Sequence, residues 1–189
     1  MKVIQFYKSE TQLIKKASKQ NREAQQAIYT KYAPKMLSVC RQYIKDLHNA
    51  EEVMMAGFLK VFLNIHKFKS EGSFEGWIRR IMVNESISFL RSKKELLFTE
   101  DISGYKEESW NNIYTELEVE EIQILIDNLP EGYKMVFVLY AIEGYKHSEI
   151  ADMLNVSENT SKSQLFKARK MLQQQLTNLN ERKNGTVKV

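Results

Sequence analysis

The chain has few cysteines, prolines and glycines: of its 189 residues, 1 is Cys, 2 are Pro and 7 are Gly. A single cysteine, Cys40, excludes a disulfide scaffold and the usual cysteine-rich zinc cluster. Scarce proline and glycine favour long helices over many tight turns. Hydrophobic residues still make up 43% of the sequence and charged residues 28%, which excludes disorder as the dominant state.

Long apolar runs are also missing. The longest, Met135–Ile142, has 8 residues, whereas a membrane-spanning helix needs about 20. Residues 1–7 contain no signal-peptide hydrophobic region, so we expect a cytoplasmic protein. There is no glycine-rich phosphate loop, and His48, His66 and His147 are scattered. We therefore expect no enzymatic activity, no metal and no cofactor, and any chemistry to belong to a partner.

The charge is sorted along the chain. Residues 1–95 carry a net +9, residues 96–128 a net −8 and residues 129–189 a net +3. Basic blocks attract phosphate and an acidic tract avoids it, which suits a nucleic-acid-binding protein. Solvated charged surfaces that bind nothing are the alternative explanation of the same pattern.

Apolar residues recur at helical spacing almost throughout, and no strand-like alternation persists, so the sequence predicts an all-α protein. Pro34 is expected to start or kink a helix. The helical pattern fails between Arg91 and about Glu116. We therefore predict two helical domains joined by an acidic linker. Their expected bounds are residues 1–94 and 117–180, with a flexible linker at 95–116 and a tail at 181–189.

Residues 143–170 have the pattern of a helix-turn-helix. His147–Leu154 should form a short first helix, and Asn155 tolerates the left-handed conformation at its end. Ser157 is a good N-cap for the second helix. The outer face of that second helix should present groups suited to phosphates and base edges. A generic helical hairpin with a solvated basic face is the alternative. The residues expected on this face are Asn159, Thr160, Lys162, Ser163, Lys167 and Lys170.

The C-terminal part carries a series of short motifs in a fixed order. They are Leu129-Pro130, Val136-Phe137, Glu143-Gly144-Tyr145, Glu149-Ile150-Ala151, Val156-Ser157-Glu158-Asn159-Thr160, Lys162-Ser163 and Lys167-Ala168-Arg169. This series resembles domain 4 of sigma-70-type RNA polymerase sigma factors, whose compact members that lack further domains form the extracytoplasmic-function group. The resemblance implies a region 2-like helical bundle and a region 4-like helix-turn-helix that together direct transcription initiation. Its implied contacts to the −35 promoter element are Ser157, Asn159, Thr160, Lys162, Ser163 and Lys167.

The N-terminal half agrees, because residues 50–62 look like the family's core-binding helix and residues 74–91 are similar to its −10-reading segment. The implied contacts to core polymerase are Glu52, Met55, Ala56 and Lys60. The implied contacts to the melted −10 element are Lys67, Phe68, Lys69, Arg79, Arg80, Asn84, Ser88 and Arg91.

This sequence departs from the family pattern at several positions. Met55 and Ala56 stand where Gln and Glu are common, so we expect a more apolar polymerase interface if Met55 is exposed. Ser161 replaces a usual Val, which weakens a core contact unless its hydroxyl bonds back to the preceding turn. Gln164 stands where Arg is common, which should reduce phosphate affinity or alter base preference.

The resemblance also implies partners: core RNA polymerase, promoter DNA and an anti-sigma factor. In the family, the linker threads the RNA path of polymerase. Its acidic residues here either mimic RNA phosphates or form a solvated spacer. These are Glu100, Asp101, Glu107, Glu108, Glu116 and Glu118. The alternative function is a stand-alone helix-turn-helix transcriptional regulator with an unrelated N-terminal domain.

Overall fold

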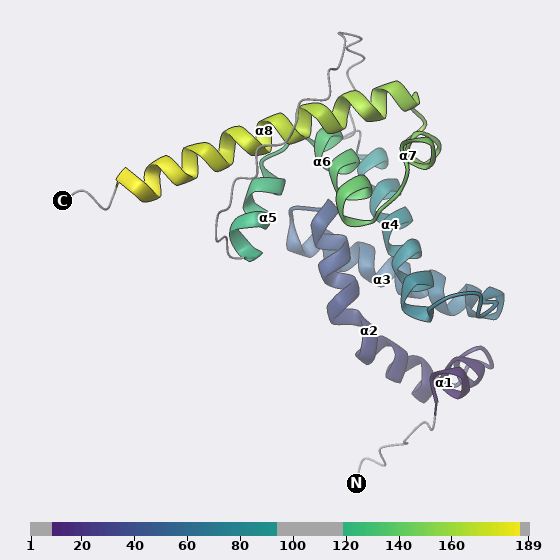
Figure 1. Ribbon diagram of the computed structural model, residues 1–189. Helices are drawn as coiled ribbons and strands as arrows, with labels where there is room; N and C mark the ends of the chain where they lie inside the picture. Colours follow the sequence, from purple (N-terminus) through teal and green to yellow (C-terminus); the bar gives the residue numbers. More distant parts are fainter. Residues whose placement is uncertain (1–8, 94–118, 186–189) are drawn as a thin grey trace. The chain divides into compact units, whose positions relative to one another are not determined.

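A computed structural model describes residues 9–93 and 119–185 of the chain (Figure 1). Within these ranges every regular element is a helix, which confirms the predicted all-α class. The six acidic residues predicted to act in the linker, Glu100 to Glu118, lie outside the described residues. No helix in the described ranges is long and apolar enough to cross a membrane.

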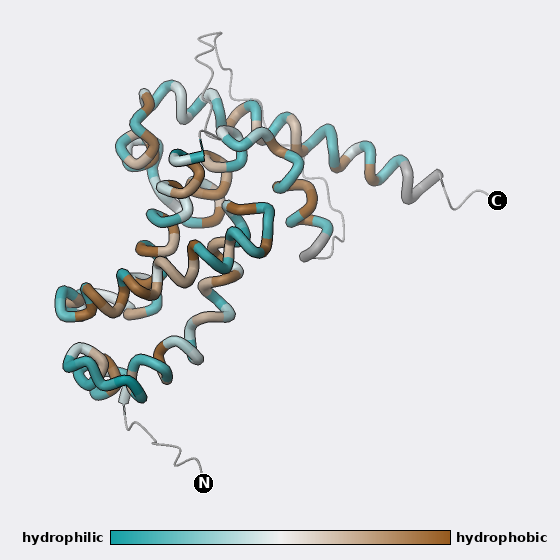
Figure 2. Tube along the Cα trace, turned by 180° about the vertical axis from the view of Figure 1, so that it is seen from behind, coloured by the Kyte–Doolittle hydropathy of each residue, from teal (hydrophilic) through white to brown (hydrophobic). Residues whose placement is uncertain are grey.

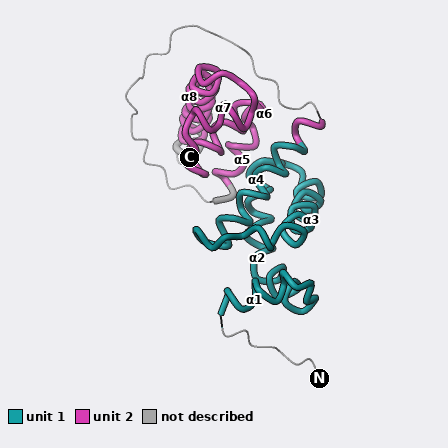
Figure 3. Tube along the Cα trace, turned by 90° about the vertical axis from the view of Figure 1, so that its right-hand side faces the viewer, with its two compact units in different colours: residues 1–89 teal, residues 90–189 magenta. Residues whose placement is uncertain are grey.

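The chain divides into two compact helical units, residues 1–89 and 90–189 (Figure 3). Hydrophobic and hydrophilic residues alternate along the helices of both units (Figure 2). This is the pattern of helices that bury one face and expose the other. The two predicted helical groups are therefore present.

Side-chain caps begin the helices of the first unit. Ser9, Asn21 and Asp46 each accept a hydrogen bond from a backbone N–H in the first turn of the helix that follows. Ser73 likewise accepts from the Gly76 N–H at 3.0 Å. The elements are α1 (Glu10–Ala17), α2 (Arg22–Tyr43), α3 (Leu47–Asn64), the short 3₁₀ turn η1 (Ile65–Lys67) and α4 (Phe74–Ser92).

Pro34 does not start a helix, contrary to that part of our expectation. It lies inside α2, which runs without a break from Arg22 to Tyr43. Proline removes one backbone donor from a helix and crowds the preceding turn. Buried side chains lie on both sides of it, among them Tyr32 and Met36. Their burial in the core keeps the helix continuous through the proline.

Helices α2, α3 and α4 enclose the core of the first unit. Gly57 of α3 allows a close approach, because a Cβ built there would lie 2.4 Å from the sulfur of Met82 in α4. Cys40 of α2 is fully buried in this core. Burial raises the pKa of its thiol to about 11. The thiol is therefore in its neutral, unreactive form at physiological pH.

The second unit is built on the long helix α8. Helices α5, α6 and α7 each pack against α8 (Figure 1). Its core consists of apolar side chains from all four helices, including Leu125, Met135, Ile150 and Leu165. Between α6 and α7 the chain forms a π-helical turn, which sequence periodicity did not predict. The elements are α5 (Val119–Asp127), α6 (Glu131–Phe137), the π turn η2 (Val138–Ile142), α7 (His147–Leu154) and α8 (Glu158–Gly185).

Candidate nucleic-acid interface

Helices α7 and α8 form the predicted helix-turn-helix. The Glu149 carboxylate accepts the backbone N–H of Lys146 at 2.8 Å, which fixes the start of α7. Asn155 ends α7 in the left-handed conformation, with φ 54° and ψ 51°. The N–H of Val156 then donates to the Ala151 carbonyl at 3.1 Å. The turn is closed by local hydrogen bonds of the kind the sequence indicated.

Two hydroxyls fix the first turn of α8. Ser157 Oγ accepts the backbone N–H of Thr160 at 2.9 Å, as expected of an N-cap. The same oxygen lies 2.8 Å from Thr160 Oγ1. The N–H of Ser161 donates to the Ser157 carbonyl at 3.1 Å. The beginning of this helix is therefore firmly placed relative to the turn.

Fewer side chains are exposed on the outer face of α8 than the sequence suggested. Ser157, Asn159 and Lys162 are exposed, and Lys167 is half-buried. Thr160 and Ser163, which we expected on the same face, are only 6% and 2% exposed. The Ser163 hydroxyl donates to the Thr160 carbonyl at 2.8 Å. Short hydroxyl side chains that bond to their own helix do not reach outward, so these two residues serve the local fold.

Ser161 and Gln164, two of the residues that depart from the family pattern, are both buried. Ser161 is fully buried, and its Oγ lies 2.9 Å from Nδ1 of His147 in α7, whereas the sequence had led us to consider only a bond back to the preceding turn of its own helix. Gln164 is fully buried as well. It therefore lies off the exposed face of α8 on which an arginine would meet phosphate.

Lys162 has a carboxylate neighbour on its own helix. Its Nζ lies 2.8 Å from Glu158 Oε1, one turn earlier. This hydrogen bond lowers the pKa of the Glu158 carboxyl. Both side chains are about half exposed. Such a pair is weak in water, so Lys162 is free to exchange the carboxylate for another anion.

A second polar surface lies on α4. Arg80, Asn84, Ser88 and Arg91 are all exposed, and their spacing of three or four residues places them along one side of the helix. Arg79 beside them is half-buried. Cations along the helix and amide and hydroxyl groups between them suit a nucleic-acid strand.

The loop before α4 carries aromatic and basic residues together. Lys67 and Lys69 are exposed, while Phe68 is half-buried between them. The ring of Phe68 packs 5.1 Å from that of Phe74 and 5.6 Å from that of Trp77. Phe74 is 1% exposed and belongs to the core. Phe68 and Trp77 therefore lie next to the buried ring of Phe74, and part of each of their own rings is exposed to solvent.

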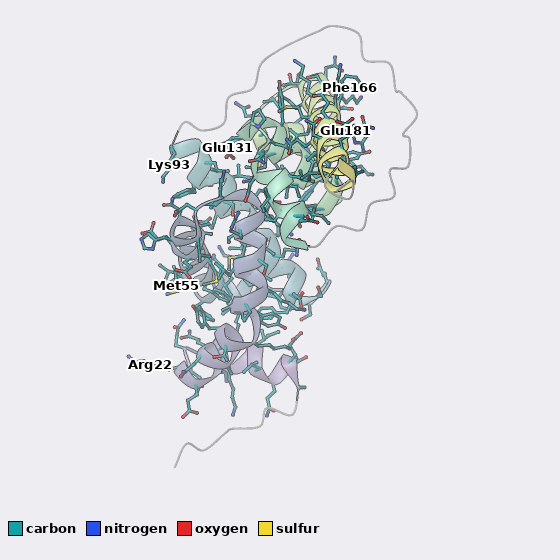
Figure 4. All side chains as sticks on the ribbon, turned by 90° about the vertical axis from the view of Figure 1, so that its left-hand side faces the viewer. Arg22, Met55, Lys93, Glu131, Phe166 and Glu181 are labelled. Atoms are coloured by element: carbon teal, nitrogen blue, oxygen red, sulfur yellow. The ribbon has the colours of Figure 1, made fainter. Side chains whose placement is uncertain are left out.

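An apolar stripe runs along the outside of α3. Met55 is 55% exposed, and it lies at the surface of the first unit (Figure 4). Leu59 and Leu63 follow at intervals of four residues and are 62% and 61% exposed. We call Met55, Leu59 and Leu63 the α3 stripe. Sequence reasoning missed both leucines, although the four-residue spacing from Met55 was visible.

Polar residues border the α3 stripe. Glu52 and Ala56 are exposed, as a binding surface requires. Lys60 is also exposed, but its Nζ pairs with Glu85 of α4 at 2.6 Å. The Tyr29 hydroxyl lies 3.4 Å from the sulfur of Met55, which holds this side chain at the surface. Exposed apolar groups with a polar border are typical of protein-binding surfaces.

Within the described ranges, no group of three or more His, Cys, Asp or Glu side chains is arranged to hold a metal ion. The described fold defines a class of protein: it is all-helical, with a helix-turn-helix, the motif of many DNA-binding proteins, in one unit and an exposed apolar stripe in the other.

Comparison with known proteins defines the family. Residues 28–95 match Sigma-70 region 2, and residues 120–172 match Sigma-70, region 4. The ECF RNA polymerase sigma factor SigW of Bacillus subtilis (strain 168) is 29% identical over 179 residues, which cover 88% of this chain and 96% of that protein. The ECF RNA polymerase sigma-E factor of Haemophilus influenzae is 24% identical over 177 residues, or 87% of this chain and 93% of that one.

Two solved structures share the fold. The sigma factor RpoE, in complex with the anti-sigma factor NepR from Bartonella quintana, aligns with a TM-score of 0.53 at 18% identity, over 80% of this chain and 96% of that chain. CnrH in complex with the cytosolic domain of CnrY aligns with a TM-score of 0.50 at 18% identity, over 88% of this chain and 96% of that chain.

The chain belongs to the sigma-70 family of RNA polymerase sigma factors, in its extracytoplasmic-function group. It directs promoter recognition and transcription initiation and is not itself an enzyme.

Proposed function

We propose that the two helical units divide the work of promoter recognition. The first unit binds core polymerase and the melted −10 element, and the second unit reads the −35 element. One observation carries this proposal: all but the last six residues of the region 2 match (28–95) lie in the first unit, and the whole region 4 match (120–172) lies in the second. We place the functional domains at residues 1–94 and 117–180, with an acidic linker at 95–116 and a tail at 181–189.

The DNA-reading end of α8 is its first two turns. Helix-turn-helix proteins place the N-terminal residues of the second helix against base edges. Ser157, Asn159 and Lys162 are exposed there, and Lys167 follows on the flank. The amide of Asn159 suits a base edge, while Lys162 suits a phosphate or a guanine. Thr160 and Ser163 support this face by shaping the turn beneath it.

The −10 element meets the α4 face and the loop before it. Single-stranded DNA is bound where cations follow its backbone and its bases can stack or enter a pocket. The half-buried ring of Phe68 offers a stacking surface between two exposed lysines. The residues proposed to contact this element are Lys67, Phe68, Lys69, Arg79, Arg80, Asn84, Ser88 and Arg91.

Core polymerase binds α3 through Glu52, Met55, Ala56 and Lys60. The α3 stripe supports this assignment, because it supplies exposed apolar area beside the Glu52 carboxylate. The surface is more apolar than the Gln and Glu of related sequences would make it. Lys60 contributes once its ion pair with Glu85 is rearranged or covered.

An anti-sigma factor is the proposed regulatory partner. Two solved relatives are bound to other proteins, NepR and the cytosolic domain of CnrY, and the first of these is named as an anti-sigma factor. We infer that this chain is held inactive in the same way and acts in the cytoplasm, where core polymerase is found. The acidic linker would then mimic RNA phosphates in a basic polymerase channel.

Run-off transcription tests the division of work. The purified chain is added to core polymerase with a promoter found by mapping the 5′ ends of transcripts after overexpression. Initiation that requires both the −35 and −10 sequences supports the proposal. A stand-alone regulator would bind the fragment without enabling core polymerase to start, and that result would overturn it.

A further inference from the structure

Four side chains from three elements meet behind the DNA-reading end of α8. His147 of α7 bonds through Nδ1 to Ser161 Oγ of α8 at 2.9 Å. Its ring stacks on that of Tyr140 in η2, with centroids 4.6 Å apart and an interplanar angle of 22°. The Arg169 guanidinium lies 5.5 Å from the Tyr140 ring centroid. We call these four residues the His147 junction.

The two hydrogen-bonding members satisfy each other. Ser161 is fully buried and His147 is half-buried. A buried hydroxyl that loses its partner is destabilising, whereas replacing both partners by apolar groups is nearly neutral. A Val at position 161 would leave Nδ1 of the imidazole facing a methyl group. His147 and Ser161 are therefore matched to each other in this chain.

The junction lies directly beneath the exposed residues of α8. Ser161 is next to Lys162 and two residues from Asn159 in the first turns of the helix. A shift of this turn relative to α7 would move both side chains relative to a bound duplex. Misplacement of about 1 Å at a functional site is enough to weaken its action strongly.

We propose that His147 is a positioning residue for promoter recognition: through Ser161 it fixes the first turns of α8 against α7, and so places Asn159 and Lys162. This inference rests on the proposed −35-reading role of the second unit. Under this inference, His147 contributes to promoter recognition without contacting DNA. Recognition of the −35 element is then sensitive to mild acid.

The environment of the His147 ring determines whether −35 recognition strengthens or weakens in acid. Burial, followed by the nearby Lys162, lowers the pKa of His147, and Arg169 adds to the effect while Glu158 opposes it. The phenol of Tyr140 covers one face of the ring. The neutral imidazole is thus favoured in the intact junction. As pH falls below the ordinary value for histidine, protonation favours an opened junction, and recognition of the −35 element weakens.

The experiment measures how strongly holoenzyme prefers the mapped promoter over the same fragment with a scrambled −35 sequence. Ser161→Val and His147→Phe each remove one partner, and His147→Phe keeps an aromatic ring for Tyr140. We expect each single variant to lower this preference about five- to tenfold, and the double variant to recover to within about twofold of wild type. Circular dichroism of each full-chain variant at the assay temperature checks that its helices are folded, because core-polymerase binding is assigned to the first unit and would not report on the second.

The pH profile separates positioning from general stability. Wild-type preference should fall as pH decreases from about 6.5, the ordinary histidine value, through the lowered pKa of His147. His147→Asn keeps a hydrogen-bonding group near Ser161 but does not titrate, so it should retain the preference and lose the pH dependence. His66→Phe, at an exposed histidine of the first unit, should keep the wild-type profile.

The inference is overturned if the single variants keep the wild-type preference, or if His147→Asn keeps the wild-type pH profile. A different result would count against the proposed function itself: wild-type holoenzyme that initiates equally well with the scrambled −35 sequence. The wild-type measurement therefore distinguishes the two failures.

Discussion

Lys134 of α6 donates a hydrogen bond through Nζ to Asp127 Oδ1 of α5 at 3.0 Å, and their side chains are only 1% and 5% exposed. Gln123 also donates to this carboxylate oxygen, at 3.2 Å. A buried ion pair of this kind contributes little net stability over an apolar pair. Removing one member of the pair, however, leaves the charge of the other member buried and uncompensated.

Lys134→Met should therefore destabilise the second unit by about 3–5 kcal/mol. Adding Asp127→Leu should recover most of that loss, because both charges are then gone. Lys35→Met is the matched control: its pair with Glu75 is largely exposed, and its loss should cost under about 1 kcal/mol. Urea unfolding of the full chain, followed by circular dichroism, measures all three. Equal stability of Lys134→Met and wild type would contradict the prediction.

Gly57→Leu should destabilise the first unit by about 1–3 kcal/mol through overpacking. The Cβ position is already occupied by the Met82 thioether, and leucine is a good helix former, so a loss cannot be due to helix propensity. A second change, Met82→Ala, should restore part of the loss. At Gly72 an added Cβ meets nothing within 4 Å, so Gly72→Ala should leave the thermal midpoint nearly unchanged.

Leu59→Lys should weaken binding to core polymerase about tenfold or more without lowering stability, because the side chain is exposed in the free chain. Leu47→Lys supplies the control. Leu47 is 54% exposed on the same helix, but it is the first residue of α3, about two turns before Met55 and so beyond the end of the α3 stripe. Fluorescence titration of labelled chain with core polymerase gives both affinities. A comparable loss in both variants would show that charge on α3, and not the stripe, decides binding.

Lys162→Ala should weaken promoter recognition and leave core-polymerase binding unchanged, which is the opposite of the effect expected for Leu59→Lys. Initiation that depends on the −35 element should fall several-fold, and the log–log salt slope of promoter binding should decrease in magnitude by about 1. Affinity for core polymerase should stay at the wild-type value, since Lys162 is in the second unit. If core binding fell in parallel, the assignment of roles to the two units would be wrong.

Glu10 predicts a change of stability with pH. Lys31 and then Tyr32 hydrogen-bond to its carboxylate and lower its pKa below the ordinary value. The stabilisation is therefore present above the ordinary carboxyl pKa and is lost as pH falls through the lowered one. At neutral pH, Glu10→Gln should cost under about 1 kcal/mol, because the pair is partly exposed.

Thermal unfolding between about pH 7 and about pH 3 checks this. The wild-type advantage over Glu10→Gln should shrink toward the acid end. Glu71→Gln, at an exposed position in the loop before α4, should show no such trend. A constant difference across the range would mean that the Glu10 carboxylate does not titrate as described.

Sequence reasoning succeeded where local chemistry decides the structure. The left-handed Asn155 and the Ser157 cap were predictable because each acts through neighbouring backbone groups. Pro34 shows the limit of such rules, because tertiary burial on both sides outweighed its local preference. The π turn η2 likewise breaks the helical period on which the prediction relied.

The candidate site was predicted less completely than the fold. Thr160 and Ser163 fit the outward spacing of α8, but their short hydroxyls bond locally and are buried. The partner of Ser161 was missed because His147 lies 14 residues away, in a different helix. Spacing along a single helix carries no information about such a contact.

The buried thiol of Cys40 also has a practical consequence. It is the single cysteine of the chain, and burial with a pKa near 11 makes it a poor nucleophile toward maleimides or disulfide reagents. A reporter cysteine at an exposed position outside the proposed binding residues, such as Leu47 of α3 or Gln174 of α8, can therefore be labelled selectively without removing the native residue. Dyes at these two sites would show in real time, and in which order, each helix reaches its target during assembly of the transcription complex.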